Sequence, residues 1–255
     1  MAAEQGTSES GVASMLTMAR FHLRVLLSTP FFVFTALSTP ASFCILKLLG
    51  SAGEAADGKL WTLVVMAGVW GTTTTSAGII GFQRFQGTLP YLVLSPLSPV
   101  LALAPVILSA VLIGAVVGLP ESLALCAILG ATPSLGVPQL AGCALIVSSC
   151  ASLAPLIAVP FLYTRNASAF EPIVLVCAWL LSGGLAPVDS FPPVLATIAR
   201  LSPLTWAVEQ ATADVLVAPT MAVCLLLCMA CAFAGRILMA HAVRLSRATG
   251  TLGVI

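Results

Sequence analysis

"GFQRFQGTLPYLVLSPLSPV", residues 81–100, is a short polar stretch that separates two long apolar runs. Proline-containing turns at its end stop any helix before the chain becomes apolar again. The whole chain is 59% hydrophobic and 7% charged, whereas a soluble domain averages about 25% charged residues. Too few polar side chains remain to cover a surface in water, so the sequence predicts an all-α polytopic membrane protein. A net charge of +1 without a basic stripe excludes a nucleic-acid partner.

The apolar runs predict the transmembrane helices, because crossing the hydrocarbon core of a bilayer takes about 20 apolar residues. Residues 122–135 contain Gly and Pro and are too short to cross, so we expect them to be re-entrant or interfacial. The remaining runs predict six spans, at approximately Pro30–Leu49, Leu60–Gly81, Pro99–Leu119, Pro138–Leu162, Ala169–Ala186 and Val215–Ala240.

Two segments outside the spans have their own patterns. Residues 12–28 are amphipathic at helical spacing, with Arg20, His22 and Arg24 near the end, and predict an N-terminal interfacial helix. The alternative is a simple extension of the first span. Residues 183–214 are rich in Pro, Gly and Ser, and we expect two short re-entrant extracellular helices, broken near Pro192–Pro193. We therefore divide the chain into a disordered cytoplasmic tail, 1–11, and a single transmembrane domain, 12–255.

The distribution of Lys and Arg predicts the orientation in the membrane. A seventh span at 122–135 would place the C-terminal arginines outside, against this bias. With six spans, both termini are cytoplasmic, and the protein is expected in the plasma (inner, cytoplasmic) membrane. Seven basic residues then lie inside and three outside: Arg20, Arg24, Arg84, Arg165, Arg236, Arg244 and Arg247 inside, and Lys47, Lys59 and Arg200 outside.

This orientation places residues 81–100 in the cytoplasm. A short helix that points off the membrane, followed by a turn back, would form a docking surface for a cytoplasmic partner. An ordinary connecting loop is the alternative.

Two segments carry a resemblance to a known family. "QRFQGTLPYLVLSPLSP", residues 83–99, resembles the segment after the second span in permeases of the ATP-binding-cassette (ABC) type-2 exporter family. "LLSGGLAPVDSFPPVLATIARLSPLTWAVE", residues 180–209, resembles that family's signature. Gln83 and Pro90 stand where the family usually has Glu, so the first segment is less acidic than in the family.

The resemblance implies that two permease subunits, identical or paralogous, form the pore in the lipid bilayer. Separate cytoplasmic ABC ATPase subunits would bind ATP and Mg, and this chain would have no catalytic site, metal or nucleotide of its own. The ATPase-docking residues would be Gln83, Arg84, Gly87, Thr88 and Leu89. The extracellular gate would comprise Ser182, Gly183, Pro187, Pro192, Pro193, Pro203 and Glu209.

A nucleotide-binding pattern and a cysteine pattern are read as coincidental. Residues 53–59, "GEAADGK", fit G-x-x-x-x-G-K, but Leu60 stands where a phosphate-binding loop needs Ser or Thr. Cys224, Cys228 and Cys231 share one helical face, but metal ligation would need further ligands, so small apolar filler is favoured.

The substrate class follows only weakly from the apolar spans. They suit efflux of a hydrophobic or amphipathic molecule, such as a drug or a lipid-linked or natural-product-like compound. Two alternatives stay open: a secondary, ion-coupled transporter, and a non-transporting anchor or assembly subunit. The second, third, fourth and sixth predicted spans have no acidic residue in their central portions, which argues against the first alternative. Hydroxyls within the second span either line the translocation pathway or pack against a neighbouring helix, or, as the second alternative, they bond back to their own helix: Thr72, Thr73, Thr75 and Ser76.

Overall fold

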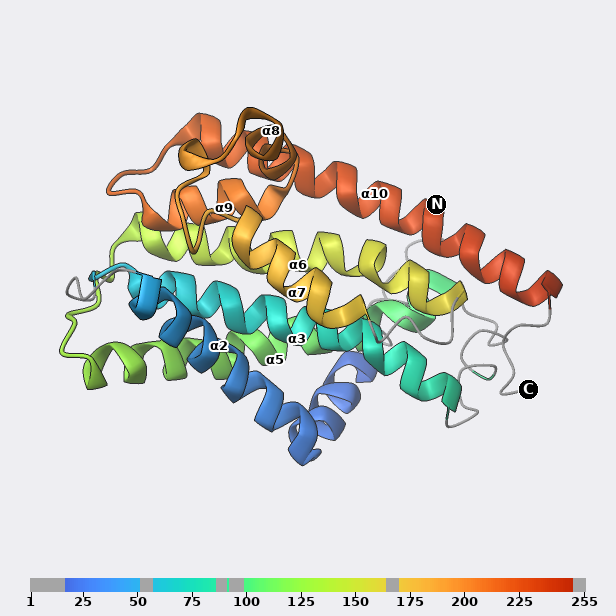
Figure 1. Ribbon diagram of the computed structural model, residues 1–255. Coiled ribbons are helices and arrows are strands. Elements are labelled where there is room, and N and C mark those ends of the chain that lie inside the picture. The colour runs from blue at the N-terminus through green and yellow to red at the C-terminus, as the bar shows by residue number, and fades with distance from the viewer. Residues whose placement is uncertain (1–16, 51–56, 86–90, 92–98, 164–169, 250–255) are drawn as a thin grey trace, which may run out of the picture.

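The computed structural model describes residues 17–50, 57–85, 91, 99–163 and 170–249, and these form a bundle of helices without a strand (Figure 1). The long helices are α2 (Pro30–Gly50), α3 (Leu60–Phe85), α5 (Pro99–Ile128), α6 (Val137–Tyr163) and α10 (Ala218–Thr249). The shorter elements are α7 (Glu171–Leu181), the 3-10 turn η2 (Val188–Ser190), α8 (Pro193–Arg200) and α9 (Pro203–Thr212).

α2, α3, α5 and α6 alternate in direction, α7 runs back toward the start of α6, and α10 runs the same way as α6 (Figure 1). α3 lies at the centre of the bundle between α2, α5 and α6. This alternation brings the connections around residues 57–60, 129–136 and 182–217 to one end of the bundle, which we call the α8–α9 end. The C-terminus of α3 and the N-terminus of α5 lie at the opposite end.

Four of the described helical segments are long and apolar enough to cross a membrane: Pro30–Gly50, Leu103–Ile128, Val137–Pro160 and Ala218–Leu245. With 26 residues, α3 is long enough, but its threonines make it less apolar. At 11 residues α7 is apolar but shorter than the thickness of a bilayer. Six spans, with α3 and α7 as the other two, stay a prediction.

The segment 122–135, expected to be re-entrant or interfacial, is not a separate element, and that prediction is wrong for residues 122–128. Its first part forms the last two turns of α5, which passes through Pro120 to Ile128. One internal proline removes a single backbone hydrogen bond, and packing in the bundle keeps the helix continuous. Gly130, with φ +70°, stops the helix: the N–H of Gly130 donates to the Ala127 carbonyl at 3.2 Å and the N–H of Ala131 to the Cys126 carbonyl at 2.9 Å.

Other boundaries differ for identifiable reasons. α3 extends to Phe85 and α10 to Thr249, beyond the expected ends at Gly81 and Ala240. An apolar run predicts only the part of a helix that crosses the membrane, and the helix can continue past it. α7 ends at Leu181, five residues early, because the chain turns at Gly183 with φ +82°.

The two short helices after α7 are present, but their break is not at Pro192–Pro193. Pro193 is instead the first residue of α8, where its fixed φ suits the first turn and its missing N–H leaves no hydrogen bond unmade. The break lies at Leu201–Ser202, and the Ser202 side chain caps α9 by accepting from the Leu204 N–H at 3.3 Å.

Residues 17–27 form the expected amphipathic helix, and it turns sharply into α2 (Figure 1). Ala19 and Leu26 are buried against α2 and α5, whereas Arg20 and Arg24 are exposed. The hydroxyl of Ser109 on α5 donates to the carbonyl of Ala19 at 2.9 Å. This helix is therefore a packed element and not a continuation of the first span.

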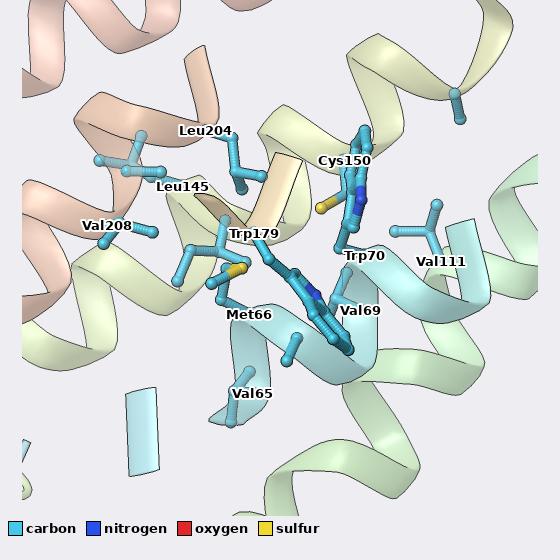
Figure 2. Close-up of a cluster of buried hydrophobic side chains, with 14 of the residues drawn as sticks. Val65, Met66, Val69, Trp70, Val111, Leu145, Cys150, Trp179, Leu204 and Val208 are labelled. Atoms are coloured by element: carbon cyan, nitrogen blue, oxygen red, sulfur yellow. The ribbon is translucent and has the colours of Figure 1, made fainter. Parts of the chain in front are cut away.

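The hydrophobic core surrounds α3 and contains buried residues from the helices that pack against it. Small residues let α3 and α5 approach closely: the Cβ that Gly114 lacks would lie 2.6 Å from the Val69 Cα. Phe43 of α2 packs edge-to-face on Trp179 of α7 with ring centroids 5.3 Å apart. Figure 2 shows the surrounding cluster, with Val65, Met66, Val69 and Trp70 of α3, Val111 of α5, Leu145 and Cys150 of α6, and Leu204 and Val208 of α9.

Candidate functional site

The chain between α7 and α8 folds into a turn whose polar groups are satisfied internally. The Ser182 hydroxyl donates to the Trp179 carbonyl at 3.0 Å and accepts from the Gly184 N–H at 3.3 Å. Gly183 has φ +82°, a backbone conformation that side chains disfavour. These contacts reverse the chain at the α8–α9 end.

α9 is held against its neighbours by hydroxyl contacts. The Thr205 hydroxyl lies within hydrogen-bonding distance of the Ala199 carbonyl at 2.7 Å and the Leu181 carbonyl at 3.2 Å. On the other side α9 packs against α6 so closely that a Cβ at Gly142 would overlap the backbone of Ala211. α9 is thereby buried along almost its whole length, and Glu209 is its only exposed residue.

A crevice of about 260 Å³ opens between this turn and α9. Its wall brings together four of the seven residues expected at an extracellular gate. The other three, Pro192, Pro193 and Pro203, stand at the starts of α8 and α9. The four lining residues are Ser182, Gly183, Pro187 and Glu209.

Charged groups that the sequence did not pair also line the crevice. The Arg200 guanidinium contacts the Asp189 carboxylate at 2.8 Å and lies 5.9 Å from the centre of the Trp206 ring. Glu209 has neither an ion pair nor a side-chain hydrogen bond within the described part of the chain. The only sequence signal for the Asp189–Arg200 pair was the presence of two charges in an otherwise apolar segment.

Contacts between segments distant in sequence close the α8–α9 end. The Lys59 ammonium pairs with the Asp214 carboxylate at 2.7 Å, and the buried Gln139 amide donates to the Ala213 carbonyl at 2.8 Å. The Lys47 ammonium donates to the Leu185 carbonyl at 3.1 Å. All three expected outer cations, Lys47, Lys59 and Arg200, therefore lie at this end.

The threonines of α3 are buried inside the chain. The hydroxyls of Thr72 and Thr73 donate to the carbonyl of Val69, at 3.1 and 2.5 Å, and that of Thr75 to Gly71 at 2.9 Å. These bonds match the second alternative, in which the hydroxyls bond back to their own helix. Thr72 and Thr75 also border a crevice of about 10 Å³ near Leu26. The side chain of Ser76 lies outside the described residues.

Most of the expected ATPase-docking residues lie outside the part of the chain that the structure describes. Gln83 and Arg84 belong to the last turn of α3, but their side chains are not described. Gly87, Thr88 and Leu89 lie in an undescribed range. The structure does place both flanking helix ends at the end opposite the crevice (Figure 1).

The coincidental patterns have structural roles where they are described. Lys59 of the G-x-x-x-x-G-K stretch is ion-paired, and the Gly58 carbonyl accepts from the Ser134 N–H at 2.9 Å. Cys224 and Cys228 are buried with their sulfurs 3.5 and 3.6 Å from the Ser149 hydroxyl. No group of three potential metal ligands occurs among the residues that the structure describes.

A comparison with protein families decides the class. The model of the ABC-2 type transporter family matches residues 13–216, which is most of the chain. The chain belongs to this family. A comparison with curated proteins gave no match.

Membership in the ABC-2 type family defines the general role. The chain is the permease, or membrane component, of an ABC transporter, and such components are generally non-catalytic. The ATPase is a separate subunit with which the permease associates. The apolar helices agree with this assignment as a membrane protein.

Proposed function

We propose that this ABC-2 permease forms, with a second permease subunit, identical or paralogous, the pathway for ATP-driven efflux of a hydrophobic or amphipathic substrate. Cytoplasmic ATPase subunits bind ATP and Mg and supply the energy. The observation that carries this proposal is the family match over residues 13–216, which includes both segments 83–99 and 180–209.

The lengths of the helices support docking of the ATPase at residues 83–89. The helix of residues 17–27 packs beside Val106, Ala110 and Ile113 of α5, so the first turns of α5 extend beyond it. α3 likewise continues about 15 Å past Thr75, at 1.5 Å per residue. If residues 17–27 lie in the membrane interface, the last turns of α3 and the first turns of α5 project off the membrane.

The same arrangement supports a six-span topology with the α8–α9 end outside. α3 and α7 then supply the remaining spans, and the crevice lies at the outer end of the pathway. Thr72 and Thr75 would contribute to that pathway through the small crevice that they border. Labelling of a single cysteine at position 55, in a cysteine-free background, should occur from the outside. Labelling only from the cytoplasmic side would refute the orientation.

The docking proposal is tested with Arg84→Glu and Gly87→Trp. Loss of a partly buried charged contact is expected to weaken association by about 2–5 kcal/mol, and a bulky residue at 87 should obstruct close approach of the ATPase. Arg244→Glu is the control, because it reverses an exposed charge on the last turns of α10. The measurements are co-purification of the ATPase and substrate-stimulated ATP hydrolysis.

Normal co-purification and coupling in both variants would show that residues 83–89 are only a connecting loop. Loss in both, with the Arg244 variant unaffected and all three variants inserted, would support docking there. A non-transporting anchor subunit predicts that no substrate stimulates the partner ATPase.

One observation favours ion-coupled transport as a second candidate. Because α5 continues to Ile128, Glu121 lies inside a candidate span, and its Oε2 is buried without a hydrogen-bond partner among the described residues. An ionisable group inside a span is often functional. Transport that persists without the ATPase and is abolished by Glu121→Gln would favour this candidate over the exporter.

A further inference from the structure

The crevice between the 182–190 turn and α9 has three hydroxyl groups among its lining residues. Each hydroxyl on its wall has one hydrogen to donate. The Ser182 hydroxyl donates to the Trp179 carbonyl at 3.0 Å, Thr205 to Ala199 at 2.7 Å and Thr212 to Val208 at 3.0 Å. All three hydroxyl hydrogens are therefore directed to the backbone, and none is left to donate to a ligand.

The charged side chains on the wall of the crevice also favour a cation. Arg200 is the only cation among the lining residues, and its charge is balanced by Asp189 at 2.8 Å. The Trp206 ring lies under the same guanidinium. Glu209 is left as a carboxylate without a partner in the described part of the chain, so the wall carries a net negative charge.

The position of Glu209 sets it apart from an ordinary surface carboxylate. It lies on one stripe of α9 with Thr205 and Thr212, at i−4 and i+3, and all three line the crevice. Elsewhere α9 is buried or half-buried, so Glu209 is its one exposed group. A ligand in the crevice would therefore meet the Glu209 carboxylate as the exposed group of α9.

Apolar surface adjoins the crevice. Pro187, Val188 and Val208 form part of the wall. α8, which borders the crevice through Arg200, exposes apolar side chains at helical spacing: Val194, Leu195 and Ile198, with Leu201 just after its end. Such a helix suits the surface of a bilayer, where the tail of an amphiphile would lie beside it.

We infer that this crevice binds the ammonium group of a cationic amphiphile, with Glu209 as its counter-ion. The volume of about 260 Å³ accommodates a headgroup with a short apolar stem. The inference rests on the proposed function, since the crevice is a substrate site only in a protein that transports. The substrates of the permease would be amphiphiles that carry a cationic, donor-bearing group.

The test uses two probes with the same carbon skeleton and opposite charge, 4-phenylbutylammonium and 4-phenylbutyrate. The full chain is placed in phosphatidylcholine nanodiscs, and binding is measured by equilibrium dialysis with empty discs subtracted. We expect the ammonium to bind at least tenfold more tightly than the carboxylate. Binding of the ammonium should weaken as the salt concentration rises, because the site is open to solvent.

Two variants act on the site by different routes. Glu209→Gln removes the charge but keeps the shape, and Thr212→Lys places a cation one turn away. Each should weaken ammonium binding at least tenfold. Asp214→Asn is the matched control, because Asp214 is an exposed carboxylate at the same end that does not line the crevice, and its variant should stay within twofold of the original chain.

Equal binding of the two probes, unchanged binding in both site variants, or an equal loss in the Asp214 variant would each overturn the inference. Co-purification with the ATPase separates this result from the proposed function. A permease that couples to its ATPase but binds no ammonium refutes only the inference. One that binds the ammonium at Glu209 but never couples to an ATPase refutes the proposed function.

Discussion

The close approach of α3 and α5 predicts that two glycines on the same helix respond in opposite ways to the same substitution. A Cβ at Gly114 would lie 2.6 Å from the Val69 Cα and 2.9 Å from the Gly68 carbonyl oxygen, and would overlap the Thr72 hydroxyl. A Cβ at Gly118 would meet its nearest neighbour, the Gly68 Cα, at 3.8 Å, which is an ordinary contact.

The magnitude follows from these distances. Carbon atoms pack best at about 3.5–4.0 Å, so Gly114→Ala requires α3 and α5 to separate by roughly 1 Å. Overpacking of this kind destabilises by about 1–3 kcal/mol, and alanine returns about 0.5–1 kcal/mol over glycine in a helix interior. We expect a net loss of about 1–2 kcal/mol. Gly118→Ala keeps the helix gain and should be neutral or stabilising by up to about 1 kcal/mol.

The neighbours of Gly114 have little freedom to relax. Two of the overlapping groups are backbone, and the Thr72 hydroxyl is held by bonds of 3.2 and 3.1 Å to the Gly68 and Val69 carbonyls. The assay is thermal unfolding in nanodiscs, where Gly114→Ala should lower the Tm by roughly 2–8 °C and Gly118→Ala should not lower it. Equal shifts for both variants would refute the reasoning from the close approach.

Two further predictions concern the helix of residues 17–27 and the α8–α9 end. Burial lowers the pKa of His22, so its contribution to stability is present above the unfolded pKa of about 6.5 and is lost as the pH falls below that value. Proteolysis of the 17–27 helix should therefore increase between pH 7 and pH 5, and His22→Gln should remove the pH dependence; the same pH response in that variant would exclude His22. Gln139→Leu leaves the Ala213 carbonyl without its buried donor and should destabilise by about 1–3 kcal/mol. Lys59→Ala breaks a pair whose Asp214 partner is largely exposed, and it should change the free energy of unfolding by under about 1 kcal/mol. A larger loss from Lys59→Ala than from Gln139→Leu would contradict the argument from burial.

Residues in the first and fourth expected spans show how much the sequence alone determined. α2 begins at Pro30, as expected, and ends one residue past Leu49, and α6 extends one residue beyond Pro138–Leu162 at each end. In both cases the helix coincides with an apolar run of bilayer length. Composition and hydrophobic length are properties of local sequence, so membrane class and these helix positions follow without tertiary information. The likeness of residues 83–99 and 180–209 to the ABC-2 family was also readable locally, and the family match confirms it.

Tertiary structure alone decided where helices continue and which side chains meet. Pro120 looked like a boundary, but packing in the bundle keeps α5 continuous and places Glu121 inside a candidate span. The pairing of Arg200 with Asp189, of Lys59 with Asp214 and of Gly114 with Val69 joins residues from different elements. Hydrophobic periodicity specifies which face of a helix is buried but not which neighbour covers it. The crevice beside Glu209 therefore appears only when the turn after α7, α8 and α9 have packed, because its walls come from all three.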